Sequence, residues 1–442
     1  MHLTAVRYLG YLDNMNAKRL EISRLYHRFG FGPRPGQYAA ALRSGAVELR
    51  KEVLAQTATT VTTPPVFADL GPRPKPNTPE VIDFVLGLRQ QSEELLLWWL
   101  DQMVESDSPL LERATWFWHG HWATSISKVN YPRPMYLQNE TMRTNALGDF
   151  TTMAESMLQD CALQFWLDGQ VSTLKAPNEN LAREFMELFT LGVNRYSEDD
   201  VKALSRVFTG YQVNVSSGVT IFNPKRHDSS AVKLLGTTQV FTPADAAKYL
   251  VAQPDCGLFL RERIWYRFIS STEPMARGFM SGVATTERNF ANLLTSAASD
   301  AVLKETKYAL VKSPVEWFVA ACRALEVKPS ELDNYNQLVR HLDKLGQVPF
   351  NPPNVGGWPA GESWLSSASA QYRIAFATWL VKQSSLEALK ALPVDRRIMQ
   401  AADWLGVAEW SPRTQGALRN SLSNPEEFAV LALCSPEYVV SA

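Results

Sequence analysis

Helical periodicity is the feature that most restricts what this chain can fold into. Apolar residues recur at three- and four-residue spacing along most of the sequence, as they do on the buried face of an amphipathic helix. Alternation of apolar and polar residues is clear only over residues 211–222, which predict a hairpin turning at Ser216-Ser217-Gly218. We therefore predict a mostly α fold, a large multi-helix globular body with a small β-hairpin near 211–222. The helices are expected over residues 93–104, 109–119, 147–157, 180–191, 199–209, 246–251, 313–325, 334–345 and 368–382.

Two proline-rich segments interrupt the helical pattern. Residues 59–80 hold six prolines and predict an extended connection between an N-terminal helical segment, 1–58, and a main helical domain, 81–442. Residues 346–366 combine four prolines and four glycines with Trp358 and Trp364. A flexible linker does not normally carry two tryptophans, so this segment is expected to be a structured loop. The two tryptophans either anchor the loop to the hydrophobic core or hold it in place over a functional site.

Charge and cysteine content exclude several classes of protein. The 44 basic residues nearly balance the 45 acidic ones, giving a net charge of -1, which argues against binding of nucleic acid or anionic membranes through overall charge. No apolar stretch is long enough to span a bilayer. The N-terminus lacks the apolar core of a signal peptide, which predicts a cytoplasmic location. The four cysteines, at 161, 256, 322 and 434, form no CxxC pair and are expected to be free buried thiols.

The segment Phe117-Trp118-His119-Gly120-His121-Trp122 places two of the six histidines one residue apart. On a continuous helix such residues point in nearly opposite directions and cannot share a ligand. If the helix ends at Gly120 in a left-handed conformation, the chain reversal brings both imidazoles toward one point, where they could bind a metal ion. Alternatively, His119 caps the helix dipole and His121 packs among aromatic residues.

The second candidate segment, residues 178–192, carries carboxylates on an expected helix. At 100° per residue, Glu184 falls inside the apolar arc and Glu187 on its border, whereas Arg183 falls outside. A buried carboxylate needs a partner or a proton, so Glu184 is predicted to meet a metal, an arginine or a catalytic proton. A structural pair with Arg143, Arg206 or Arg263 is the other interpretation.

The third candidate is the pair His227-Asp228, in a loop just after the expected hairpin. Loops of this kind often deliver metal ligands or a general base. Together the three segments offer nitrogen and oxygen ligands suited to Zn, Fe or Mn. The sequence contains no GxGxxG, P-loop, HExxH or GxSxG motif, so no nucleotide cofactor is expected.

These segments are the ones in which the chain resembles the bacterial DUF1800 family. The matching stretches, in order from about residue 23 to 440, are RFGFGP (28–33), FWHGHWATSISKV (117–129), PNENLAREFMELFTLGV (177–193), DVKALSRVFTGY (200–211), FNPKRHDSSAVKLLG (222–236), VKSP (311–314), PPNVGGWPAGESWL (352–365) and ALCSPEY (432–438). The resemblance implies a largely helical fold but no agreed activity. Family members often carry an export signal, which would imply an exported location. They are also often encoded beside a sulfatase-like protein, which the resemblance implies as a possible partner.

Two functions remain open from the sequence. The first is a metal-dependent enzyme that catalyses either hydrolysis or oxygen-dependent chemistry on an anionic substrate. Its predicted metal ligands are His119, His121, His227, Glu184 and Asp228. Its predicted catalytic carboxylates are Glu184, Asp228 and Glu187, and its predicted substrate-binding residues are Arg143, Arg206, Lys233, Trp358 and Trp364. The second is a non-catalytic interaction protein in which the same polar residues form structural networks.

Overall fold

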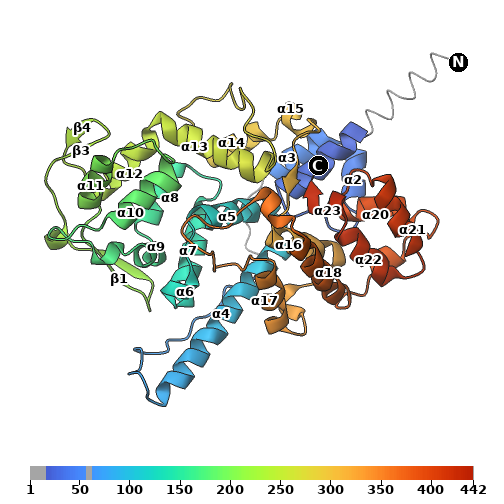
Figure 1. Cartoon of the computed structure of the whole chain (residues 1–442), viewed down its shortest axis with the longest axis horizontal. Helices are drawn as coiled ribbons and strands as arrows, with labels where there is room; N and C mark the ends of the chain where they lie inside the picture. Colours follow the sequence, from blue (N-terminus) through green and yellow to red (C-terminus); the bar gives the residue numbers. More distant parts are fainter. Residues whose placement is uncertain (1–15, 56–61, 442) are drawn as a thin grey trace.

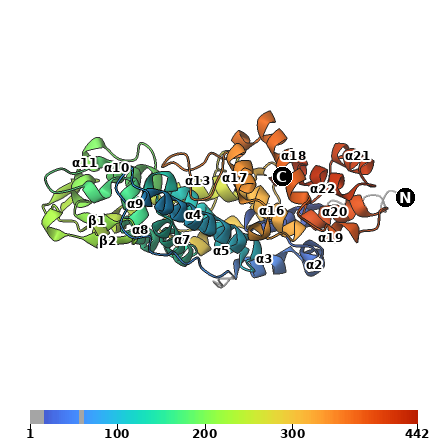
Figure 2. The ribbon, with the colours of Figure 1, turned by 90° about the horizontal axis from the view of Figure 1, so that it is seen from below.

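The computed structural model describes residues 16–55 and 62–441 and confirms a mostly α-helical fold. In Figures 1 and 2 the helices α8–α13 and strands β1–β4 form one end of the molecule, and helices α2, α3 and α18–α23 form the other. Helices α4, α5 and α7 lie side by side between them. The N-terminal part of α4 projects beyond the rest of the molecule (Figure 1). Among the described residues, no helix combines the length and apolar character needed to cross a bilayer.

The elements up to the middle of the molecule are residues 16–28 (helical), α2 (Gln37–Ser44), α3 (Ala46–Leu54), α4 (Glu80–Glu105), α5 (Pro109–His121), α6 (Ile126–Val129) and α7 (Pro132–Asn145). The next group is α8 (Phe150–Leu158), α9 (Cys161–Trp166), η1 (Gly169–Val171), α10 (Glu179–Glu184), η2 (Phe185–Thr190), α11 (Glu198–Val207), η3 (Pro224–Arg226), α12 (Pro243–Ala252), α13 (Pro254–Ile264), η4 (Trp265–Ile269), α14 (Phe290–Ala297) and α15 (Asp300–Leu303). The last group is α16 (Pro314–Leu325), η5 (Pro329–Glu331), α17 (Tyr335–Lys344), η6 (Gly361–Trp364), α18 (Ser367–Val381), α19 (Glu387–Lys390), α20 (Arg397–Leu405), α21 (Pro412–Asn420), α22 (Pro425–Leu433) and α23 (Pro436–Val439).

Local sequence explains where several of these helices begin. Ser197, Thr242 and Ser313 each accept a hydrogen bond from the third residue of the following helix, and an acidic side chain there returns the bond to the cap. These capping boxes satisfy backbone N–H groups that would otherwise lack partners. Each predicted helix overlaps an observed one, and α4 begins well before the predicted start at residue 93.

The predicted hairpin is confirmed as β1 (Tyr211–Asn214) paired with β2 (Val219–Phe222), in a register that places Tyr211 opposite Phe222. Gly218 in the turn has a φ of 75°, a value that glycine adopts without steric cost. The described residues also contain two antiparallel pairs that the sequence did not indicate. These are β3 (Val232–Leu234) with β4 (Thr237–Gln239), and β5 (Leu310–Val311) with β6 (Val440–Ser441).

The described part of the proline-rich connection, residues 62–79, has no helix or strand and runs along α4. Thr62 donates its backbone N–H to Gln102 Oε1 at 3.0 Å, and Gln91 donates to the Ala68 carbonyl at 2.9 Å. The N-terminal helices bury Leu25, Phe29 and Leu49 in the same apolar cluster as α5, α8 and α10. The division of the chain at residues 58 and 80 stays a prediction.

The core consists of two apolar clusters that meet at α5. The first cluster contains Leu110, Phe117 and Trp118 of α5 together with residues from the N-terminal helices and from α8 to α14. The second contains Trp116 of α5 together with residues of α4, α16, α18 and α20–α22. Because α5 has its N-terminal and central side chains buried nearly all round, it is the shared wall of both clusters.

Candidate functional site

Helix α5 continues through His121, so the predicted chain reversal at Gly120 is wrong. Gly120 lies within the helix and is not among the glycines with positive φ. The two imidazoles therefore leave the helix in different directions, as residues two apart must. His119 packs against Trp99, Trp116, Phe350 and Trp358, whereas His121 packs within a different set of aromatic rings. The rings around His121 are those of Phe117, Trp118, Trp122, Phe150, Phe189 and Phe259.

Both imidazoles are buried and each already has a backbone partner. His119 Nε2 accepts the Phe350 N–H at 3.0 Å, and burial lowers the pKa of His119 to about 3. His121 donates its Nε2–H to the Phe189 carbonyl at 2.9 Å. Burial, and then the charges of Arg263 and Arg267, hold the pKa of His121 well below its usual value. Both histidines are therefore neutral at pH 7, and both hold neighbouring segments to the end of α5.

The segment 178–192 does not form one continuous α-helix. It begins as α10 and passes into the π-helix η2, where Leu191 and Gly192 both donate backbone N–H groups to the Met186 carbonyl. Glu184 is half-buried, and burial followed by the charge of Glu187 raises its pKa. Glu187 accepts a hydrogen bond from the Tyr196 hydroxyl. The wider turn shifts the side chains after residue 184 away from the positions that a regular helix predicts.

His227 and Asp228 lie in a separate polar cluster beside the β1–β2 hairpin. His227 Nδ1 lies 3.1 Å from the Thr209 carbonyl. Asp228 accepts a bond from Arg206 Nε at 2.7 Å. Burial alone would raise the pKa of Asp228, but hydrogen bonds from Arg206 and Ser230 lower it to about 2. The Asp228 carboxylate is thus a paired anion, and its partner is one of the residues predicted to bind substrate.

The described residues contain no group of three or more His, Cys, Asp or Glu side chains that could hold a metal ion. The five predicted ligands therefore do not form one ligand group. His119 and His121 lie on different sides of α5, Glu184 stands next to Glu187, and the pair His227-Asp228 belongs to the hairpin cluster. Each of these polar groups instead has its own neighbours.

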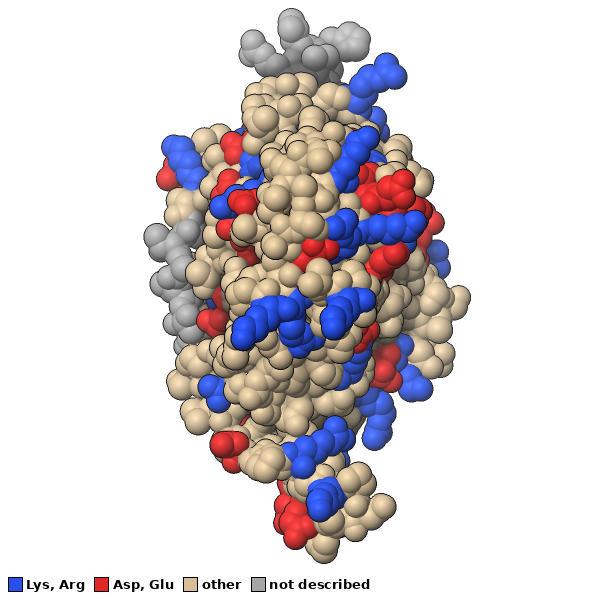
Figure 3. Space-filling model, turned by 90° about the vertical axis from the view of Figure 1, so that its left-hand side faces the viewer, with Lys and Arg blue, Asp and Glu red and all other residues tan. Residues whose placement is uncertain are grey.

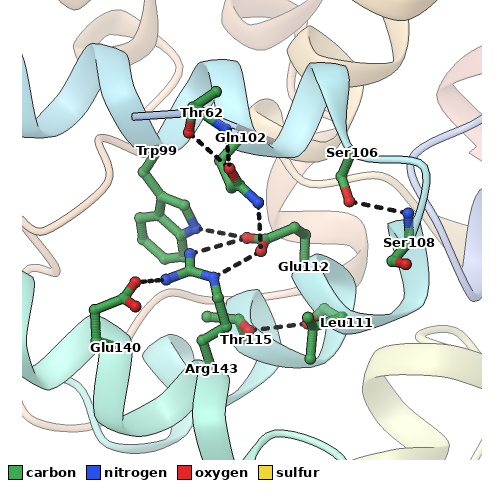
Figure 4. A network of polar contacts seen from close by, with 10 residues as sticks. All are labelled: Thr62, Trp99, Gln102, Ser106, Ser108, Leu111, Glu112, Thr115, Glu140 and Arg143. Carbon is green, nitrogen blue, oxygen red and sulfur yellow. Dashed lines mark hydrogen bonds and ion pairs between the residues drawn. The ribbon is translucent and has the colours of Figure 1, made fainter. Parts of the chain in front are cut away.

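Arg143 belongs to a buried network rather than to a binding surface (Figure 4). Its guanidinium donates to Glu112 at 2.7 and 3.0 Å and also pairs with Glu140. Trp99 Nε1 donates to the same Glu112 carboxylate at 3.1 Å. The network connects α4, α5 and α7 in the interior, with Glu112 fully buried. Arg143 therefore has two carboxylate partners within the chain.

The other predicted substrate-binding residues fall into two places. Arg206 and Lys233 line one cavity of about 560 Å³ together with Asp199, Asp200 and Lys202. The molecular end formed by α11, β3 and β4 carries basic and acidic side chains mixed together (Figure 3). Trp358 and Trp364 are each only 4% exposed, and Trp358 stacks on Trp116 with centroids 5.4 Å apart. The two tryptophans thus anchor their loop to the second apolar cluster.

The same loop nevertheless borders a cavity that was not among our predictions from the sequence. This cavity, which we call the arginine pocket, has a volume of about 740 Å³. One wall is the face of α13 and η4 that carries Phe259, Arg263 and Arg267. The remaining walls are residues 271–275 and the loop residues Ala360, Glu362 and Ser363.

The two arginines of the pocket differ in their contacts. Arg267 donates to the Trp358 carbonyl at 2.8 Å and to the Pro359 carbonyl at 3.3 Å, so it holds the loop in place. Arg263 has no carboxylate within ion-pair distance anywhere in residues 16–55 and 62–441, and its buried Nε has no hydrogen-bond acceptor there. Burial, and then the neighbouring charge of Arg267, lowers the pKa of Arg263 to about 9. Arg263 is thus a largely charged side chain without an anionic partner, facing a cavity.

The pocket is connected to the predicted segments through His121. The imidazole lies against Phe259 of the pocket wall, with ring centroids 5.9 Å apart, and its buried Nδ1 has no hydrogen-bond partner among the described residues. Two π-helices, η2 and η4, meet this region, and such turns are frequent at functional sites. A sequence signal for the pocket did exist: Arg263 and Arg267 lie four residues apart on one helix with no acidic residue between them.

The model of a family described as "Protein of unknown function (DUF1800)" matches residues 24–440, nearly the whole described chain. No curated protein and no solved structure matched the chain. The aromatic shell of α5, both π-helices, the arginine pocket and its loop all fall within the matched residues. The chain therefore belongs to the DUF1800 family.

Proposed function

We propose that the protein binds a small anionic molecule in the arginine pocket. The observation that carries the proposal is Arg263, a half-buried guanidinium that lines a cavity of about 740 Å³ and has no carboxylate partner in the described chain. A partly desolvated cation without a counter-ion is costly, and an oxyanion bound by the guanidinium fork would offset that cost. A carboxylate, phosphate or sulfate group meets this requirement.

The pocket geometry supports binding of a molecule larger than a single ion. Its volume is in the range of cavities that hold small ligands, and its walls combine an aromatic face with convergent polar groups. Arg267 is fixed by two loop carbonyls and adds a second positive charge beside Arg263. This is a binding function and is related to the non-catalytic alternative predicted from the sequence. Metal-dependent hydrolysis or oxygen chemistry, and a sulfatase-like partner, stay predictions and play no part in this proposal.

The test is a comparison of anion binding by the wild type and Arg263→Met. Inorganic phosphate is titrated calorimetrically in a buffer of low ionic strength that lacks phosphate, sulfate and sulfonate. We expect saturable binding by the wild type and at least about a tenfold weaker affinity in the variant, because a hydrogen bond to a charged group contributes roughly 1.5–3 kcal/mol. The Met side chain keeps the apolar stem of the arginine, so packing changes little.

The melting temperature of Arg263→Met distinguishes a specific loss of phosphate binding from a loss of folding. Removing Arg263 relieves its repulsion with Arg267, so we expect the variant to melt at the wild-type temperature or above it. Arg413→Met, at an exposed position on α21, is the matched control and should bind phosphate as the wild type does. Equal phosphate affinity in wild type and Arg263→Met, or no saturable binding by the wild type, would overturn the proposal.

A further inference from the structure

The charges of the arginine pocket are separated by depth. Arg263 and Arg267 are half-buried, whereas the lining residues Glu273 and Glu362 are exposed at the rim. A third lining carboxylate, Glu262, is paired with Arg195 at 2.9 Å. Within the described residues, neither Glu273 nor Glu362 has an ion-pair partner. The pocket therefore has a positive floor and a negative rim.

A ligand with only negative charge would satisfy the floor but would be repelled by the rim. The two rim carboxylates belong to different segments, residues 271–275 and the loop that contains η6. They therefore approach the ligand from two walls. Electrostatic complementarity favours a molecule with a negative group near the arginines and a positive group near the two rim carboxylates.

We infer that the natural ligand is a small zwitterion with an oxyanion at one end and an ammonium group at the other. This inference rests on the proposed anion-binding function and names the chemical class of its ligand. The oxyanion contacts Arg263 at the floor, and the ammonium group lies between Glu273 and Glu362 at the rim. Arg267 acts as a positioning residue, because its guanidinium hydrogens are held by the carbonyls of Trp358 and Pro359.

The experiment compares phosphoethanolamine with ethyl phosphate, which has the same phosphate ester and two-carbon chain but lacks the ammonium group. Both are titrated at low ionic strength and at about pH 8, where both phosphates are dianionic. We expect phosphoethanolamine to bind the wild type more tightly, by up to about fivefold for an exposed ion pair and more if both carboxylates contribute. Added salt should reduce this preference, because exposed charges are screened.

Two variants test whether the preference for phosphoethanolamine depends on the rim carboxylates. In the double variant Glu273→Gln/Glu362→Gln the two ligands should bind with equal affinity, because ethyl phosphate gains affinity when the repulsion is removed. Glu409→Gln, at an exposed position between α20 and α21 that does not line the pocket, is the matched control and should keep the wild-type preference.

The two possible failures are distinguishable. If neither phosphate binds, the anion-binding function itself is wrong. If both bind the wild type equally and both depend on Arg263, anion binding holds and the zwitterion inference is overturned. Retention of the phosphoethanolamine preference in the double variant would also overturn it, since the ammonium group would then be bound elsewhere.

Discussion

At the scale of residues, the neighbours of each predicted side chain determine whether it is free to bind a ligand. Glu184 was expected inside the apolar face of a helix, yet it is half-buried beside Glu187, and the π-helix η2 begins at the next residue. Arg263, which the sequence suggested only as a structural partner for Glu184, instead lines the arginine pocket and has no carboxylate partner among the described residues. Sequence spacing gives the direction of a side chain, but only the neighbouring segments determine which atoms it meets.

At this scale His119 makes the stability of the protein depend on pH in a defined direction. Its pKa is about 3 in the folded protein and roughly 6.5 in the unfolded chain. The unfolded state therefore takes up a proton between these values, and the stability contributed by the neutral imidazole is present above about pH 6.5 and lost as the pH falls toward 3. At about pH 5 this loss amounts to roughly 2 kcal/mol.

The measurement compares the wild type with His119→Gln by urea unfolding at about pH 7.5 and pH 5. We expect the variant to be less stable at the higher pH, with the difference narrowing by roughly 2 kcal/mol at the lower pH. Trp358→Phe alters the same aromatic shell without a titratable group, so its destabilisation should not change between the two conditions. A constant difference for His119→Gln would show that the imidazole has the same pKa in the folded and the unfolded protein, which would contradict the prediction.

At the scale of elements, the loop after residue 350 is fixed by backbone contact with α5. Gly357 has a φ of 77°, and a Cβ at this position would lie 2.5 Å from the Gly120 carbonyl oxygen. The missing side chain of Gly357 thus allows the loop to touch the backbone at the end of α5. The same loop supplies Ala360 and Glu362 to the arginine pocket.

Gly357→Ala is therefore expected to destabilise the protein by roughly 1–3 kcal/mol and to weaken phosphate binding. The added methyl group forces the loop away from α5 and disturbs the carbonyls that hold Arg267. Gly356→Ala is the matched control, because a Cβ there would meet only the flexible Asn354 side chain, at 3.2 Å. Thermal melting and phosphate titration of both variants give the comparison, and equal effects of the two substitutions would contradict the close contact.

At the scale of the whole molecule, α5 joins the two apolar clusters, and the network of Glu112 fixes α5 to α4 and α7. Removing the charge of Glu112 leaves Arg143 buried with only Glu140, which is partly exposed. Unpairing a buried ion pair typically costs about 3–5 kcal/mol. We therefore expect Glu112→Gln to lower the free energy of unfolding by about this amount.

Because α5 belongs to both clusters, this loss should shift a single unfolding transition rather than split it. Urea unfolding followed by tryptophan fluorescence and by far-ultraviolet circular dichroism measures both the size and the coincidence of the change. Glu140→Gln is the control and should have a smaller effect, since its side chain is 34% exposed. Two separate transitions in Glu112→Gln would mean that the clusters unfold independently.

The sequence by itself determined the fold class, the positions of most helices, the hairpin at 211–222 and the match to the DUF1800 family. Apolar spacing, capping residues and turn glycines act over a few residues and can therefore be read directly from the chain. Tertiary structure alone decided that α5 continues through Gly120, that His119 and His121 face different shells, and that η2 is a π-helix. It also decided that Arg263 faces a cavity, because a side chain's partners come from segments far apart in sequence, whose approach depends on how the whole core packs.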